Sequence, residues 1–430
     1  MASAFKPYPP ISSTIPPLLL GTAAFNYQYN SSPSSLPTHS IIQHALDSGL
    51  LGFDTSPYYG PAEAMLGASL TDPDLRAKYP RESYFLTTKV GRISAETFDY
   101  SPAWVRQSVS RSISRLGAGG WLDLVLCHDV EFVSAAEVLG AIAALRELRE
   151  LREPRDDGTT AVPVPTVRYV GISGYPLGVL CDLAELVLRE TGEPLDAVMS
   201  YANFTLQNTR LHTAAAARFK AAGVAVVLNA SPLGMGLLRT NGVPVGTMGD
   251  WHPAPAGLRE ACARAAEFCE KQQQQQITSS SNGSNSNSNS NSGGSGGSYE
   301  PLEKVALRYA LEEWMRVGGG GEAGLGTTAP FGKTQSEQPK PKPKPKGVSV
   351  CGVSYLHELT DTLDVFRSVL RAADADADTD ADAGAEEEER RRRSKTRKQL
   401  VEGIRGVLGP WVDYAWDSPG KDFVRKELEN

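Results

Sequence analysis

Tyr84-Phe85-Leu86-Thr87-Thr88-Lys89 and Leu122-Asp123-Leu124-Val125-Leu126-Cys127 are two short runs that read as buried strands. Between them, Ser101 and Pro102 form a helix cap followed by a first-turn proline, and Gly117 is placed to end that helix. The stretch therefore predicts one strand–helix–strand unit.

The same alternation extends over most of the chain. Strand-like runs lie at residues 18–21, 51–54, 84–89, 122–127, 168–173, 197–200, 224–229 and 347–352. Segments of helical period lie at residues 38–48, 102–116, 134–152, 177–189, 208–222, 257–271, 299–317 and 355–371. Eight such units predict a parallel α/β sheet, either closed into a barrel or open and doubly wound. The Gly-x-Gly-x-x-Gly motif of the open fold does not follow the first strand, so we predict a (β/α)8 TIM barrel.

Three low-complexity segments interrupt this pattern, at residues 272–298, 334–346 and 372–393. They have few apolar side chains to offset the entropy of ordering, so we expect flexible loop insertions in one barrel domain over residues 15–430. They are either partner-binding segments or tolerated surface insertions, and the small cost of long surface loops favours the second. Glu386–Glu389 directly precede Arg390–Arg393, which favours a solvated helical turn there.

Composition excludes several functions. The net charge of -7 and the lack of a broad basic face argue against nucleic acid as a partner. The five cysteines form no Cys-x-x-Cys, which predicts reduced thiols in a cytoplasmic protein, without a disulfide framework or a metal site. No stretch reaches the roughly 20 apolar residues that span a bilayer. We expect no membrane partner, and a monomer or weak homo-oligomer.

Polar side chains follow three consecutive predicted strands. Asp54 ends the second, Lys89 the third and His128 the fourth, and Tyr59 follows Asp54 by five residues. Because active sites of such barrels lie at the carboxyl ends of the strands, we expect the four to converge. Singly, each has a plain structural interpretation as a cap, a solvated lysine or a structural histidine.

The four suit the interconversion of a carbonyl and an alcohol. The phenol pKa of about 10 is too high for efficient proton transfer near neutrality, and we expect the Lys89 ammonium to lower it. Asp54 would hold Lys89, His128 would orient the reacting oxygen, and Tyr59 would exchange the proton. None of them supplies the hydride, so a nicotinamide cofactor is expected.

These residues resemble the aldo-keto reductase family. Gly52-Phe53-Asp54-Thr55-Ser56-Pro57-Tyr58-Tyr59-Gly60 is similar to its Asp-and-Tyr segment, and Lys89 and His128 match its other two catalytic positions. Residues 170–174 and 230–234 resemble its cofactor segments. The resemblance implies a barrel that binds an extended nicotinamide dinucleotide across its top. It implies contacts from Ser173 and Ser200 to the carboxamide, from Ser231 and Leu233 along the pyrophosphate, from Gly352, Ser354 and Glu358 near the adenosine, and from Gly21 and Thr22 to the cofactor.

Three positions depart from the family pattern. Gly174 stands where an Asn usually contacts the carboxamide, and Ala230 stands where many members stack a Tyr on the nicotinamide. The segment after the last strand lacks the Lys and Arg that bind a 2′-phosphate and carries Glu358, so we expect NAD rather than NADP.

The resemblance is strongest to the subgroup that oxidises aldose sugars at C1, the D-arabinose 1-dehydrogenases and L-galactose dehydrogenases. The first loop, residues 25–30, offers aromatic and amide groups suited to a sugar, so we expect Tyr27 and Tyr29 to contact it, although an ordinary polar loop is the alternative. An NADPH-dependent aldehyde reductase and a non-catalytic regulatory subunit remain open as rival functions.

Overall fold

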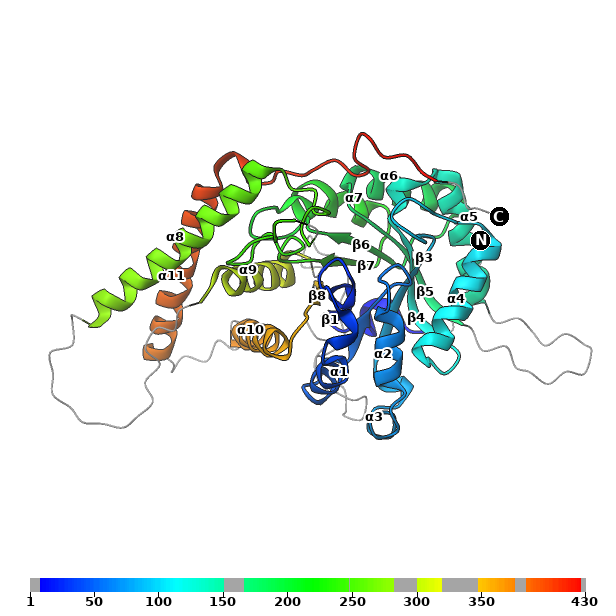
Figure 1. The fold of residues 1–430 in the computed structure, drawn as a ribbon, viewed down its shortest axis with the longest axis horizontal. Coiled ribbons are helices and arrows are strands. Elements are labelled where there is room, and N and C mark those ends of the chain that lie inside the picture. Colours follow the sequence, from blue (N-terminus) through cyan, green and yellow to red (C-terminus); the bar gives the residue numbers. More distant parts are fainter. Residues whose placement is uncertain are drawn as a thin grey trace, which may run out of the picture.

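A computed structural model describes residues 8–150, 166–246, 248–281, 300–318, 347–375 and 384–426. Eight parallel strands close into a barrel in sequence order, which confirms the predicted fold (Figure 1). They are β1 (Leu18–Gly21), β2 (Gly52–Asp54), β3 (Phe85–Val90), β4 (Leu122–His128), β5 (Val167–Gly174), β6 (Ala197–Tyr201), β7 (Val226–Ala230) and β8 (Val348–Gly352).

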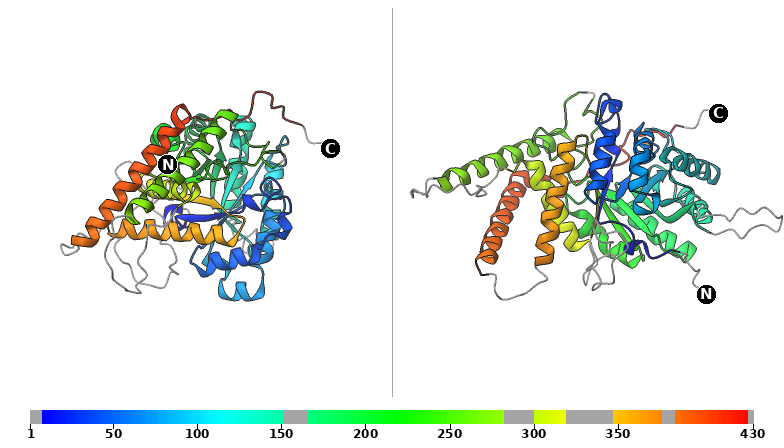
Figure 2. Two further views of the ribbon diagram at one scale, coloured as in Figure 1. Left: turned by 60° about the vertical axis from the view of Figure 1, so that its left-hand side comes forward. Right: turned by 90° about the horizontal axis from the view of Figure 1, so that it is seen from below.

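Helices surround this barrel on its outside (Figures 1 and 2). They are α1 (Thr38–Asp47), α2 (Ala62–Leu70), α3 (Pro73–Lys78), α4 (Pro102–Leu116), α5 (Ala135–Arg149), α6 (Leu177–Thr191), α7 (Ala216–Ala221), α8 (Ala256–Ser281), α9 (Leu302–Val317), α10 (Leu356–Ala375) and α11 (Gly384–Leu408). The predicted limits of α4 are confirmed, because the Ser101 side chain caps its first turn and Gly117 takes a left-handed φ of 57° at its end.

Alternate residues of each strand face the two sides of the barrel wall. One cluster fills the interior and includes Leu19, Phe85, Leu124, Leu126 and Met199. The residues between them pack outward against the helices in a second, larger cluster. Asp54, Lys89 and His128 are an even number of residues from interior positions of their strands. This alternation therefore directs their side chains toward the inside of the barrel.

The structure has helix at three points inside the segments that the sequence predicts to be loop insertions. Helix α8 continues to Ser281 through the start of the 272–298 segment, α10 continues to Ala375, and α11 begins at Gly384, where only a helical turn at the Glu–Arg run is expected. Glutamine is a good helix former, and the Glu–Arg run allows (i, i+4) pairs, so local propensity accounts for α8 and α11. Residues 282–298, 334–346 and 376–383 lie outside the described part of the chain.

Helices α8 and α11 lie side by side and extend beyond the barrel (Figures 1 and 2). Their facing apolar residues, among them Leu258, Ala265, Ile404 and Leu408, form a separate buried cluster. The chain after Leu408 then passes over the loops at the carboxyl end of the barrel (Figure 1). Within the described residues, none of the helices combines the length and apolar character that crossing a membrane requires.

Candidate active site

Asp54 and Lys89 form a buried ion pair at the carboxyl ends of β2 and β3. The Lys89 Nζ atom donates to both Asp54 carboxylate oxygens, at 2.8 and 2.9 Å, and to the Thr55 carbonyl oxygen at 2.9 Å. The exposed fraction is 1% for Lys89 and 3% for Asp54. Because a buried charge is tolerated only with good partners, these contacts fix the position of the ammonium.

The turn after β2 carries Tyr59 to the same end of the barrel. The Tyr59 N–H donates to the Ser56 carbonyl at 3.0 Å, which closes that turn. The Lys89 Nζ atom lies 4.8 Å from the centroid of the Tyr59 ring. The rings of Tyr59 and His128 meet edge to face, with centroids 5.5 Å apart. The structure thus brings together the four side chains that the sequence singled out.

His128 ends β4 as a neutral imidazole in a fixed orientation. Its Nδ1 atom lies 3.0 Å from Ser56 Oγ, which also accepts a hydrogen bond from the Tyr58 N–H at 3.1 Å. The Asp129 carboxylate lies 3.5 Å from Nε2 and favours the ring proton there, so we assign the Ser56 hydroxyl as the donor to Nδ1. Burial lowers the pKa of His128 to about 3, so Nε2 is a neutral donor near pH 7.

The pKa of Tyr59 differs from the sequence prediction. Burial and the negative charges of Asp54 and Asp129 raise the pKa of Tyr59 well above 10. In the protein without a ligand, the pKa of Tyr59 is therefore raised rather than lowered, because Lys89 does not outweigh burial and the two carboxylates. The Asp54 carboxylate pairs with the ammonium and cancels most of its field at the phenol. Tyr59 is a neutral phenol at pH 7.

An ion pair that sequence reasoning missed borders these residues. The Arg92 Nη1 atom donates to Asp129 Oδ2, and the Arg92 guanidinium lies 4.0 Å from the centroid of the Tyr58 ring. Asp129 directly follows His128 and has a φ of 55°, in the left-handed region. The acid immediately after a strand-end histidine is the sequence signal that would have pointed to this position.

The two predicted substrate residues have different surroundings. Tyr29 is partly buried, and its ring meets that of Trp251 edge to face at 4.9 Å. Burial, with the nearby Tyr59, raises the pKa of Tyr29, which places it close to the reacting groups. Tyr27 is 64% exposed and lies against Gly60, where an added Cβ would be 3.5 Å from the Tyr27 ring. Trp251 is a further aromatic group that the sequence did not identify.

Two of the predicted cofactor residues are glycines, so the backbone at these adjoining strand ends is not covered by a side chain of its own. Gly21 and Gly352 pair in register between β1 and β8. A Cβ added at Gly352 would come no nearer than 3.6 Å to any atom, so this edge is open. The Thr22 hydroxyl oxygen is buried and, within the described residues, has no hydrogen-bond partner. Open backbone and an unsatisfied hydroxyl fit the close approach of a dinucleotide.

Three more of these residues lie at the ends of β5, β7 and their loops. Ser173 pairs in register with His128, and its Oγ donates to the Cys127 carbonyl at 3.1 Å. Ser231 directly follows β7 with a φ of 55°, and Leu233 is partly buried in the same loop. Their positions at one end of the barrel agree with the predicted cofactor path.

Ser200 does not reach the barrel interior. Its neighbours Met199 and Tyr201 pack with the interior cluster, so alternation turns Ser200 to the helix-facing side. There its Oγ accepts a hydrogen bond from Asn203 Nδ2 at 2.9 Å. The adjacent Tyr201 pairs in register with Ala230, where the family pattern has a tyrosine. A phenol ring is thus present one strand away from the expected position.

Glu131 fills the space beside Gly174. A Cβ at Gly174 would lie 2.3 Å from Glu131 Oε2, so a larger residue at position 174 requires Glu131 to move. Glu131 Oε1 accepts hydrogen bonds from the Tyr175 N–H at 3.1 Å and the Ser418 hydroxyl at 3.0 Å. Burial raises the pKa of Glu131 to about 8, with a further contribution from Asp129. This carboxyl takes the volume that an Asn would occupy.

Glu358 has partners that the sequence did not reveal. Its Oε2 accepts hydrogen bonds from the backbone N–H groups of Ser354 at 2.7 Å and Tyr355 at 3.3 Å. Its Oε1 pairs with Arg239 Nη2 at 2.7 Å. Glu358 therefore caps α10, and its charge is balanced by an arginine from the loop after β7. The Ser354 hydroxyl accepts a hydrogen bond from Asn30 Nδ2 at 3.0 Å.

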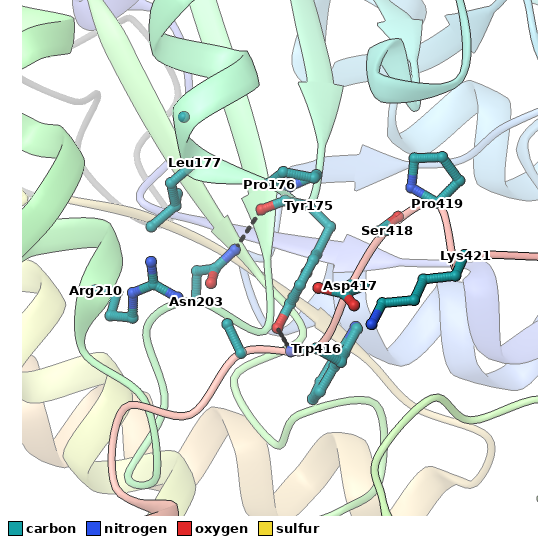
Figure 3. A pocket seen from close by; sticks show the side chains of 12 residues that line it. Tyr175, Pro176, Leu177, Asn203, Arg210, Trp416, Asp417, Ser418, Pro419 and Lys421 are labelled. Carbon is teal, nitrogen blue, oxygen red and sulfur yellow. Dashed lines mark hydrogen bonds between the residues drawn. The ribbon is translucent and has the colours of Figure 1, made fainter.

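A cavity of about 370 Å³ lies beside these loops, between α6 and the C-terminal segment (Figure 3). The rings of Tyr175 and Trp416 stack along it, with centroids 4.7 Å apart and an interplanar angle of 5°. Arg210 and Lys421 lie at its edges. None of the four catalytic candidates lines this cavity. Among the described residues, no group of three or more His, Cys, Asp and Glu side chains is arranged to hold a metal ion.

Known proteins resemble this chain in both sequence and fold. It is 37% identical over 308 residues to a D-arabinose 1-dehydrogenase of Saccharomyces cerevisiae, covering 71% of this chain and 78% of that protein. It is 34% identical over 235 residues to an L-galactose dehydrogenase of Arabidopsis thaliana, covering 54% of this chain and 65% of that protein.

Two solved structures share the fold at low identity. A glycerol dehydrogenase from Gluconobacter oxydans superimposes with a TM-score of 0.52 at 18% identity, over 97% of this chain and 98% of that one. An aldo-keto reductase from Bacillus halodurans, in its holo form, gives 0.50 at 16% identity, over 92% and 95%. The model of the aldo/keto reductase family matches residues 17–381. The chain is therefore a member of the aldo/keto reductase family, whose enzymes are oxidoreductases that use nicotinamide cofactors.

Proposed function

We propose that this protein oxidises an aldose sugar at C1 to the corresponding lactone, with NAD as the cofactor. The observation that carries the proposal is the convergence of Tyr59, Lys89, Asp54 and His128 at one end of the barrel. The names of two relatives, a D-arabinose and an L-galactose dehydrogenase, support a sugar substrate.

Each side chain has a separate task in this proposal. The His128 Nε2–H donates a hydrogen bond to the C1 oxygen and orients it. Tyr59, as the phenolate, removes the proton from the C1 hydroxyl. The buried Lys89 ammonium stabilises that phenolate, and Asp54 holds the ammonium in place. When bound, the nicotinamide accepts the hydride that leaves C1.

The cofactor path in this proposal follows the strand ends from β5 to β1. Ser173 lies by the carboxamide, Ser231 and Leu233 lie along the pyrophosphate, and Gly352 and Ser354 lie near the adenosine. Tyr201 takes the stacking role that Ala230 cannot supply. The preference for NAD depends on Glu358, because a carboxylate there disfavours a 2′-phosphate and accepts hydrogen bonds from a ribose hydroxyl.

The Tyr59→Phe variant tests the proposed base. Because the pKa of Tyr59 lies well above 10, the phenolate fraction at pH 7 is small, and the oxidation rate of the wild type rises with pH between 7 and 9. Removing the hydroxyl lowers kcat by a factor of about 10²–10⁴ and abolishes this rise. The measurement is NADH formation from D-arabinose and L-galactose, with NADH binding followed by fluorescence to show that the site is intact. Wild-type turnover in the variant would exclude Tyr59 as the base.

Arg239 favours a second candidate, an NADPH-dependent aldehyde reductase. This exposed cation pairs with Glu358 and is a group that binds a 2′-phosphate well if it turns away from the carboxylate. The Arg239→Gln variant separates the two. If NAD is the cofactor, the Kd for NAD changes less than threefold in the variant. If NADP is the cofactor, the Kd for NADP rises about tenfold or more.

A further inference from the structure

The ion pair of Arg92 and Asp129 is fixed more firmly than a surface pair. Besides Asp129, the Arg92 guanidinium donates to the carbonyl oxygens of Ser94 at 3.2 Å and Ala95 at 3.3 Å. It also lies 4.0 Å from the Tyr58 ring centroid. The position of Arg92 is therefore defined from several sides, and it holds the Asp129 carboxylate in one place.

Asp129 is buried in an unfavourable backbone conformation. Its exposed fraction is 3%, and its φ of 55° is one that residues other than glycine rarely adopt. Burial by itself raises the pKa of Asp129, but His128 and Arg92 outweigh it and hold that pKa below the usual value. A charged, buried and strained residue beside reacting groups is typical of a functional site.

The carboxylate has room for a further donor. Its contacts with Arg92 Nη1 and His128 Nε2 both go to Oδ2. Within the described part of the chain, Oδ1 has no hydrogen-bond donor. Because no donor from the described residues occupies Oδ1, this oxygen is available to accept a hydrogen bond from a ligand hydroxyl.

Asp129 and His128 together match the pattern of two adjacent hydroxyls. The His128 Nε2–H is a donor and the Asp129 carboxylate is an acceptor. The distance from His128 Nε2 to Asp129 Oδ2 is 3.5 Å. An oxygen bound at Nε2 and at Tyr59 is the reacting oxygen. The oxygen on the neighbouring carbon of the same molecule then falls within reach of the carboxylate.

We propose that Asp129, positioned by Arg92, accepts a hydrogen bond from the C2 hydroxyl of the aldose and makes the enzyme selective for sugars that carry it. This inference rests on the proposed oxidation at C1 and adds the substrate class to it: 2-hydroxy aldoses rather than 2-deoxy aldoses or simple aldehydes.

The test compares D-arabinose with 2-deoxy-D-ribose, which is the same sugar without the C2 hydroxyl. A hydrogen bond to a charged group predicts that wild-type kcat/KM is about 10- to 100-fold higher for D-arabinose. In Asp129→Asn this ratio falls to within about threefold of unity. If another aldose is the better substrate, its own 2-deoxy analogue replaces 2-deoxy-D-ribose.

A matched control separates recognition from stability. Asp123 is likewise a buried aspartate, at the opposite end of β4 from Asp129, and pairs with Arg81 at 2.6 Å and Arg168 at 2.9 Å. Asp123→Asn lowers the melting temperature and leaves the substrate ratio unchanged. If Asp129→Asn does not fold, Asp129→Glu, which keeps the charge and moves it by one methylene, provides the same readout of a reduced ratio.

The outcomes distinguish the two proposals. A wild-type enzyme that forms no NADH or NADPH with any aldose overturns both the C1 oxidation and this inference. A wild-type enzyme that oxidises both sugars equally well, or a folded Asp129 variant that keeps the wild-type ratio, overturns the role of Asp129 and leaves the C1 oxidation standing.

Discussion

At the scale of single residues, the protein keeps two charged pairs buried beside one phenol. Lys89 is paired with Asp54, and Arg92 with Asp129, and all four side chains are at most 14% exposed. Because each cation is balanced by a carboxylate, the two cations do not offset the burial of Tyr59, whose pKa stays above its usual value. An oxidised nicotinamide, if bound next to Tyr59, would add a positive charge that favours the phenolate.

The Lys89→Met variant measures how much the first pair contributes to the fold. Removing the ammonium leaves the Asp54 carboxyl buried without its partner, which lowers the free energy of unfolding by about 3–5 kcal/mol. Adding Asp54→Asn removes the unpaired buried carboxylate, so the double variant recovers most of the lost free energy of unfolding, although it lacks activity. Urea unfolding followed by circular dichroism gives both values. If the free energy of unfolding of Lys89→Met falls by less than about 1 kcal/mol, the ion pair is not buried away from water as described.

At the scale of secondary-structure elements, local sequence determines where a helix ends, but it does not determine which helices contact one another. Ser134 and Glu137 form a reciprocal capping box that begins α5, as the local sequence allows. The contact between α2 and α4 depends instead on Gly67, where an added Cβ would lie 1.8 Å from the Arg115 carbonyl oxygen. Helix α2 is not among the elements predicted from the sequence.

Two glycine-to-alanine variants separate these effects. Gly67→Ala forces α2 away from α4 and lowers the free energy of unfolding by about 1–3 kcal/mol. Gly140→Ala, within α5, meets no atom within 4 Å and raises it by up to about 1 kcal/mol through helix propensity. Thermal unfolding of the two variants then shows a lower melting temperature for Gly67→Ala and a higher one for Gly140→Ala. Equal shifts in both would mean that α2 and α4 are not in close contact.

At the scale of the whole molecule, the C-terminal segment joins loops that are far apart in the sequence. Trp416 stacks on Tyr175, the Ser418 hydroxyl donates to Glu131, and Arg425 pairs with Glu137 at 2.8 Å. This segment and α11 lie beyond residue 381, where the family match ends. Helix α11 packs against α8, and the C-terminal segment packs on the end of the barrel that carries the catalytic residues.

The carboxyl of Glu131 makes this packing depend on pH. Its pKa is raised from 4.5 to about 8 by burial, so the folded protein keeps a proton that the unfolded chain loses above pH 4.5. Linkage then lowers the stability of the wild type as pH rises from about 4.5 to 8, with no further loss above 8. In Glu131→Gln this loss is absent, so the difference in melting temperature in favour of the variant grows from pH 5 to pH 8. A constant difference over that range contradicts the raised pKa.

Local sequence was sufficient to predict the eight strands and the positions of Asp54, Lys89, His128 and Tyr59. Buried parallel strands are short apolar runs, and the carboxyl end of each is visible from the polar residue that follows it. Residues whose partners lie in neighbouring loops could not be predicted in this way. The Glu358–Arg239 pair joins residues 119 positions apart, and the inward direction of Tyr201 depends on the register of β6.

By itself, then, the sequence determined the barrel, the family and the four polar residues at its strand ends, because each leaves a local pattern of apolar period, cap or motif. Only the tertiary structure decided the charge around Tyr59, the neutral state of His128 and the place of Asp129 between His128 and Arg92. Burial and charge pairing are sums over neighbours from distant parts of the chain, and those neighbours become known only when the chain is folded.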